Sequence, residues 1–147
     1  MTLLLASGSK TRAEILKKAK ISFKVVDHGV DEEELKISLN ELNPKDISIQ
    51  LSEIKAIKPS MKYFEEFVIG ADQVLDFNGS LINKAANLQE AKNQLLDLNG
   101  KTHKLITAIT IAKNGSVVWK HYDVAKITMR ELSEKQIDEY LNNMDKE

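Results

Sequence analysis

Short apolar runs alternate with amphipathic stretches along the chain, and this alternation predicts its elements. Residues 3–6 form an apolar run that predicts a buried strand, and the alternating residues 21–26 predict a second one. Ser9 lies between them, where its side chain can cap a helix. The apolar face of this helix consists of Ile15, Leu16 and Ala19. The chain is therefore predicted to begin with a strand, a helix and a strand.

The next helix is marked at both ends. Asn43 is a suitable cap, and Pro44 occupies the first helical position, where proline is favoured. Apolar residues then recur at helical spacing until Pro59, which is predicted to end the helix. The acidic run at residues 31–34, which precedes this helix, indicates either a loop or a helix start.

An apolar strand at residues 67–71 leads to Asp72. The pattern predicts that this strand ends there and exposes the carboxylate, and that Gly70 lets a ligand approach the backbone closely. Residues 74–77 and 80–82 predict a hairpin, because the Asn-Gly pair between them suits a type I′ turn.

The C-terminal third predicts a helix, two strands and a last helix. A helix capped at Asn87 is predicted to end at Gly100. Strands at residues 105–112 and 117–129 lie on either side of a second Asn-Gly turn, and a capping box at Ser133 begins the last helix. Because helices mix with both hairpins and crossovers, the order predicts an α/β fold with a mixed sheet flanked by helices.

Composition narrows the classes of function. The length of 147 residues suits one domain, and 21 basic against 22 acidic residues give no overall field that favours nucleic acid or an anionic membrane. The absence of cysteine excludes disulfides and thiolate metal sites. No stretch has the pattern of a signal peptide or a membrane span, so the expected location is the cytoplasm. Any anionic ligand must be held by a local basic cluster.

The turn at residues 6–12 is the first candidate for chemistry. A strand there runs into a helix start through small and hydroxyl residues, and such a turn offers free N–H groups and the positive helix end to an anion. Lys10 and Arg12 oppose the helix dipole in the first turn, which favours a role outside the helix. A capped helix with solvated cations explains the same residues, so both interpretations stay open.

Acidic residues and lysines form the second group of candidates. Asp72, together with Asp31 or Glu32, offers oxygen ligands of the kind that Mg²⁺ prefers. Lys55 and Lys84, each taken alone, have the ordinary interpretation of a solvated side chain. The three histidines, at positions 28, 103 and 121, show no spacing that is typical of a zinc site.

Taken in chain order, these motifs resemble those of the Maf family of nucleotide pyrophosphatases. The resemblance covers nearly the whole chain, from about Leu3 to about Leu141. The matching segments are residues 6–16 (family pattern ASxSPRRxELL), Asp31-Glu32 (DE), Lys55-Ala56 (KA), residues 70–72 (GAD), Lys84 (GKP) and residues 98–103 (LSGKTH). Each motif is short, and it is their order and spacing together that make the resemblance specific.

The resemblance implies a mixed, twisted sheet like that of inosine triphosphatases. It also implies an enzyme that hydrolyses a nucleoside triphosphate to a nucleoside monophosphate and pyrophosphate, with Mg²⁺ or Mn²⁺ as its divalent cation. Asp72, Glu32 and Lys84 are implied to be catalytic, and Asp72 and Glu32 are also implied to hold the metal. The residues implied to bind the substrate are Ser7, Ser9, Thr11, Arg12, Lys55 and Gln73.

Two positions bear on the choice of base, which the resemblance implies to be non-standard or modified. Glutamine at position 73 resembles the branch of the family that acts on 7-methyl-GTP, whereas threonine there is typical of members that act on dTTP and UTP. Thr11, at the other position, matches neither branch. Gln73 therefore favours a modified or purine nucleotide.

The family's glycine-rich C-terminal segment has no counterpart here. Residues 1–147 are therefore expected to be a single Maf-like domain that is either truncated or a reduced member of the family. A reduced member would favour the alternative function, a nucleotide-binding regulatory module with little or no turnover that is linked to septum formation. The implied partners are the nucleotide and a second copy in a homodimer, with neither nucleic acid nor a membrane.

Overall fold

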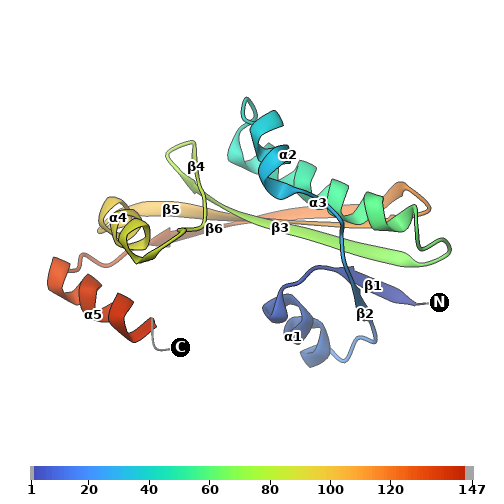
Figure 1. The fold of residues 1–147 in the computed structure, drawn as a ribbon, viewed down its shortest axis with the longest axis horizontal. Coiled ribbons are helices and arrows are strands. Elements are labelled where there is room, and N and C mark those ends of the chain that lie inside the picture. The colour runs from blue at the N-terminus through green and yellow to red at the C-terminus, as the bar shows by residue number, and fades with distance from the viewer. Residues whose placement is uncertain (1, 145–147) are drawn as a thin grey trace.

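The computed structural model describes residues 2–144 and arranges them around a mixed six-stranded sheet. The strands are β1 (Leu3–Ala6), β2 (Lys24–Val26), β3 (Phe67–Phe77), β4 (Ser80–Ile82), β5 (Thr102–Lys113) and β6 (Ser116–Thr128). The helices are α1 (Lys10–Lys18), α2 (Glu32–Ser38), α3 (Pro44–Ser60), α4 (Leu88–Leu98) and α5 (Glu134–Met144). Figure 1 shows α2 and α3 on one side of the sheet and α1, α4 and α5 on the other. The predicted α/β class with a mixed sheet is confirmed.

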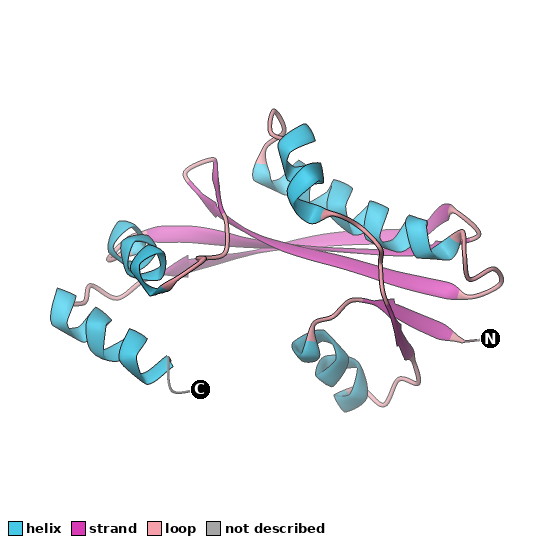
Figure 2. Ribbon diagram, viewed as in Figure 1, coloured by secondary structure: helices cyan, strands magenta, loops and turns pink. Residues whose placement is uncertain are grey.

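The sheet is split along one edge of β3. Its strand order is β2-β1-β3-β5-β6, with β1 parallel to both of its neighbours and β5 antiparallel to both of its own (Figure 2). β5 pairs with one edge of β3 along residues 68–76, so β1 and β4 must share the other edge. β1 pairs with residues 67–69 and β4 with residues 75–77. Within residues 2–144, no strand pairs with this edge at residues 70–74, and Asp72 lies at the middle of the split.

The predicted helix caps and turns are confirmed. The side chains of Ser9, Asn43, Asn87 and Ser133 each accept a hydrogen bond from the backbone N–H three residues further on. Both Asn-Gly pairs have positive φ at both residues, as a type I′ turn requires. No helix in the described part of the chain is long and apolar enough to cross a membrane.

Two local predictions need correction, and one open alternative is settled. β3 does not end at Asp72 but continues to Phe77, because its ladder with β5 is unbroken there. Pro59 does not end α3 but lies inside its last turn, one residue before the helix ends. For the acidic run, the helix start is confirmed over the loop, because Asp31 caps the backbone of Glu34 and the first-turn glutamates of α2 suit the helix dipole.

Helix α3 packs tightly against β3 at Gly70. A Cβ atom added to Gly70 would lie 2.5 Å from the backbone nitrogen of Ala56, so only glycine fits at this position. The close neighbour of Gly70 is thus the helix, and the prediction that Gly70 leaves room for a ligand is wrong. The adjoining core includes the buried side chains of Leu51 and Val68. The close packing brings the polar residues of α3 within reach of β3.

Candidate functional site

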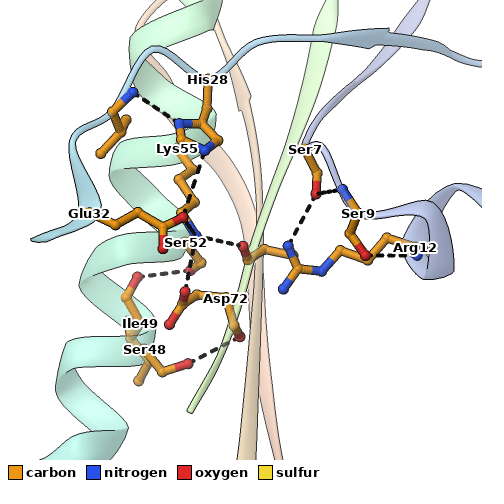
Figure 3. Close-up of polar contacts among 12 residues, drawn as sticks. Ser7, Ser9, Arg12, His28, Glu32, Ser48, Ile49, Ser52, Lys55 and Asp72 are labelled. Atoms are coloured by element: carbon orange, nitrogen blue, oxygen red, sulfur yellow. Dashed lines mark hydrogen bonds and ion pairs between the residues drawn. The ribbon is translucent and has the colours of Figure 1, made fainter. Parts of the chain in front are cut away.

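Lys55 lies between two carboxylates at the split in the sheet (Figure 3). Its Nζ atom is 2.6 Å from Oε1 of Glu32 and 3.0 Å from Oδ1 of Asp72. The three residues come from α3, α2 and β3, so the site forms only when these elements are packed together. Lys55 is only 4% exposed, and a buried ammonium group is tolerated when it is paired in this way.

Asp72 is buried rather than exposed, which corrects the sequence prediction. Only 4% of the residue is accessible, because α3 covers this face of β3. The backbone carbonyl of Asp72 accepts a hydrogen bond of 3.2 Å from the hydroxyl of Ser48. Oδ2 of Asp72 is buried and has no hydrogen-bond partner among residues 2–144. Lys55 therefore holds one oxygen of this carboxylate, and no other group among residues 2–144 satisfies the second.

The two carboxyl groups have opposite pKa shifts. Burial raises the pKa of Asp72 above its ordinary value, although the charge of Lys55 and its hydrogen bond oppose this. Burial acts in the same direction on Glu32, but the hydrogen bond and charge of Lys55 outweigh it and lower the pKa of Glu32. Lys36 and His28 lower it further. Glu32 is thus held as a carboxylate, whereas Asp72 binds a proton more readily than an ordinary aspartate.

The turn after β1 carries Ser7, Ser9 and Arg12 and lies beside the carboxylates in Figure 3. The Ser7 hydroxyl accepts hydrogen bonds from Nη1 of Arg12 (3.2 Å) and from the backbone N–H of Ser9 (3.1 Å). Because β1 pairs with β3 in the register Leu5 to Ile69, this turn comes directly to the edge of the split. The guanidinium group and the helix start form the local basic cluster that an anion needs.

A groove of about 870 Å³ adjoins the carboxylate of Glu32. It lies between α2 with the start of α3 and the β3–β4 hairpin, and both Glu32 and Lys84 line it. Lys36 lines the same groove and lies one helical turn after Glu32. The structure therefore brings Lys84, which follows β4 in the chain, to the same groove as the carboxylate of α2.

Sequence reasoning missed two residues that contact or influence the site. Nε2 of His28 lies 3.7 Å from Oε1 of Glu32, and its Nδ1 accepts a hydrogen bond from the backbone N–H of Val30. Lys36 contributes positive charge to both carboxylates. The signal in the sequence that could have identified them was spacing. His28 and Lys36 each lie four positions from Glu32, Lys36 within α2 and His28 in the segment that leads into it, so both lie on the same side as Glu32.

Two predicted substrate-binding residues lie outside the cluster. Gln73 follows Asp72 in an extended strand, so its side chain points to the opposite face of the sheet. There its amide donates a hydrogen bond of 3.1 Å to the hydroxyl of Thr107 on β5. Thr11 is exposed on α1. The structure thus does not bring Gln73 or Thr11 together with Lys55.

The carboxylates fit a divalent cation with oxygen ligands. Glu32 and Asp72 already share one positive group, the ammonium of Lys55, and Asp72 has an unsatisfied buried oxygen. No group of three or more His, Asp or Glu side chains within residues 2–144 could hold a metal by itself. Mg²⁺ is commonly bound through one or two carboxylates, with water and substrate phosphates as its other ligands. Two carboxylates beside a basic cluster match that requirement.

Comparison with protein families and relatives gives a consistent result. The family model described as Maf-like protein matches residues 2–147. A nucleoside triphosphate pyrophosphatase of Caulobacter vibrioides is 44% identical over 139 residues, which cover 93% of this chain and 69% of the relative. One of Pelagibacter ubique is 40% identical over 144 residues, covering 97% and 74%. A 7-methyl-GTP pyrophosphatase of Bartonella henselae is 39% identical over 140 residues, covering 95% and 71%.

A solved structure supports the fold. The HAM1 protein from Coxiella burnetii superposes with a TM-score of 0.58 and covers 87% of this chain and 72% of its own. The sequence identity is 13%, so this similarity concerns the arrangement of strands and helices alone.

Proposed function

Because the chain belongs to the Maf family, we propose that it is a nucleoside triphosphate pyrophosphatase. Water attacks the α-phosphorus, the bond between this phosphorus and the α–β bridging oxygen breaks, and the products are a nucleoside monophosphate and pyrophosphate. The relatives that carry this name support the proposal. The observation that carries it is the position of Lys55 between Glu32 and Asp72, at the split in the sheet.

Glu32 and Asp72 are the residues that we propose to hold Mg²⁺ or Mn²⁺. Asp72 offers the buried Oδ2 atom, which has no partner in residues 2–144, and Glu32 is kept ionised by Lys55. When bound, the cation would neutralise phosphate oxygens during the displacement. The ammonium of Lys55 fixes the orientation of both carboxylates, so they are positioned before the substrate arrives.

The remaining groups divide the work of binding and proton transfer. Arg12 and Lys84 bring positive charge to the phosphates from two sides of the split. The hydroxyl groups of Ser7 and Ser9 lie at the same helix start as Arg12 and can donate hydrogen bonds to the phosphates. Asp72 accepts the proton of the attacking water.

Pyrophosphate release from a panel of nucleotides tests the proposal. The panel contains dTTP, UTP, GTP and 7-methyl-GTP, each with Mg²⁺, with Mn²⁺ and with a chelator. We expect stoichiometric monophosphate and pyrophosphate from at least one nucleotide, and no release with the chelator. Saturable binding without release of pyrophosphate would overturn the proposal in favour of a regulatory nucleotide-binding module.

A further inference from the structure

Strand β6 forms a long free edge of the sheet. Its one strand partner among residues 2–144 is β5, and every residue of β6 except Ile127 is exposed. Unpaired N–H and C=O groups along an edge strand are a template for pairing with another chain, and proteins usually block them with short or charged edges. The other edge strand, β2, has only three residues. β6 has 13, of which only Lys120, Asp123 and Lys126 carry a full charge, so its edge is available to a partner strand.

Aromatic side chains are exposed on both faces of β6. Trp119 is 50% exposed on the face of the sheet that carries Gln73. Tyr122 is 43% exposed on the opposite face, where Nζ of Lys45 from α3 lies 5.1 Å from the centre of its ring. A strand added beside β6 would cover apolar surface on both faces at once, as expected of an interface.

The centre of β6 is complementary to itself when its direction is reversed. A two-fold axis at Tyr122 brings His121 opposite Asp123 of a second copy, and Trp119 opposite the small side chain of Ala125. Opposite residues of antiparallel strands lie on the same face, so the imidazole can donate a hydrogen bond to the carboxylate. The axis repeats each contact, and both therefore occur twice.

Neighbouring registers lack this complementarity. An axis at Asp123 places the two Asp123 carboxylates opposite each other and Lys120 opposite Lys126, and like charges directly across a strand pair are destabilising. An axis at Lys120 opposes two ammonium groups. An axis at His121 pairs the two imidazoles and leaves Asp123 opposite an aromatic side chain. Of these four central positions, Tyr122 is the one that gives the carboxylate a polar partner without opposing like charges.

We propose that β6 pairs antiparallel with β6 of a second copy of the chain, on a two-fold axis through Tyr122, to form one continuous sheet through both copies. The pairing uses residues 119–125, which belong to the part of β6 that pairs with β5 without a register shift. Backbone hydrogen bonds then satisfy the free edge of each copy. The split in β3 is separated from β6 by β5, so this interface is independent of the proposed function.

Cysteine substitution tests the pairing and its register, because the chain has no cysteine of its own. Residues directly opposite in an antiparallel pair have Cα atoms about 4.5–5.5 Å apart, within the range that a disulfide spans. Tyr122→Cys is therefore expected to give a disulfide-linked dimer on air oxidation. Val124→Cys is the matched control, because its two thiols would be four residues, or about 14 Å, apart along the strands. Linkage of Val124→Cys as rapidly as of Tyr122→Cys would overturn the proposal.

Sedimentation measurements test the charge pairing without any covalent link. The wild type is expected to be a dimer in the micromolar range. His121→Asp places carboxylates opposite each other on either side of the axis and is expected to raise the dissociation constant about tenfold, whereas the double variant His121→Asp, Asp123→Lys restores opposite charges and should regain the wild-type value. Gln89→Asp adds an acidic group at an exposed position of α4 and should leave the dissociation constant unchanged.

A wild type that stays monomeric throughout the micromolar range would overturn the proposal. So would equal dissociation constants for His121→Asp and Gln89→Asp, or a double variant that does not recover. None of these measurements requires turnover, so failure of this interface and failure of the proposed function are seen separately.

Discussion

The carbonyl oxygen of Ser52 lies so close to Gly70 that a Cβ atom added to the glycine would be 2.5 Å away from it. This contact sets the distance between α3 and β3. Lys55 is less than one helical turn after Ser52, and Asp72 is two residues after Gly70, so the same contact determines how far the ammonium lies from the carboxylate. Packing and the geometry of the proposed site are therefore coupled through one glycine.

Gly70→Ala is expected to lower both stability and activity. The new methyl group would clash with helix backbone, which cannot rotate away, and overpacking of this kind costs about 1–3 kcal/mol. Thermal unfolding measures the stability, and pyrophosphate release measures the activity. Gly8→Ala is the control, because an added Cβ at Gly8 meets nothing within 4 Å. Equal melting temperatures for the two variants would contradict the coupling.

Asp72→Asn is expected to stabilise the metal-free protein while removing at least about 99% of the turnover. Burial raises the pKa of Asp72, so the ionised carboxylate costs stability at neutral pH, and the uncharged amide avoids this cost. The contribution of Asp72 is most favourable below its unfolded pKa and is lost as the pH rises through its folded pKa. The advantage of the variant should therefore be larger at pH 7 than at pH 3.5.

Chemical denaturation at the two pH values, without divalent cations, measures this difference. Asp97→Asn makes the same change at an exposed position of α4 and should leave stability nearly unchanged. A variant at position 72 that is less stable than the wild type at pH 7 would show that the pair with Lys55 outweighs the burial of the charge.

Glu32→Gln is expected to have the opposite pH dependence. Lys55 lowers the pKa of Glu32, so ionised Glu32 stabilises the folded protein above its unfolded pKa, and this contribution is lost as the pH falls through the folded pKa. The variant should be less stable than the wild type at pH 7 and should approach it at low pH. Urea unfolding at several pH values between 3 and 7 tests this, and a constant difference would contradict it.

Ser52 and Thr110 are expected to show strong energetic coupling. Their hydroxyl oxygens are 2.8 Å apart and buried between α3 and β5. Ser52→Ala leaves the Thr110 hydroxyl without this partner, which costs about 1–3 kcal/mol. In Thr110→Val the Ser52 hydroxyl still donates to the backbone carbonyl of Ile49, so that single loss should be the smaller one. Ser52→Ala combined with Thr110→Val should recover part of that loss, because both partners are then apolar. A double-mutant cycle from denaturant unfolding measures the coupling, and strictly additive losses would contradict it.

The features that sequence predicted correctly are local ones. The caps at Ser9, Asn43 and Asn87 and the Asn-Gly turns depend on interactions within a few residues, which a single sequence contains. The alternation of apolar residues likewise predicted most of the strands. The fold class followed from these elements.

The features that sequence predicted wrongly depend on contacts between distant segments. Asp72 looked like the end of a strand, because a charged residue in the middle of a buried strand is costly unless a partner offsets it. The partner is Lys55, which comes from another element 17 residues earlier. Gly70 likewise allows the close packing of α3 on β3, which cannot be deduced from its neighbours in the sequence. The order of the motifs placed Glu32, Lys55 and Asp72 in one predicted site. Only the structure shows that Lys55 contacts both carboxylates.

Lys55→Met is expected to make the protein respond more strongly to divalent cations. Without the ammonium, Asp72 loses its cationic partner and Glu32 keeps only its contact with His28, and removing one partner of a buried pair costs about 3 kcal/mol. If the two carboxylates bind Mg²⁺ or Mn²⁺, either ion restores an opposing charge between them. Added Mn²⁺ should then raise the melting temperature of Lys55→Met more than that of the wild type. In the double variant Lys55→Met, Asp72→Asn this response should disappear, because one ligand is gone. A response that persists in the double variant would place the cation elsewhere, and this outcome can be recognised without any measurement of turnover.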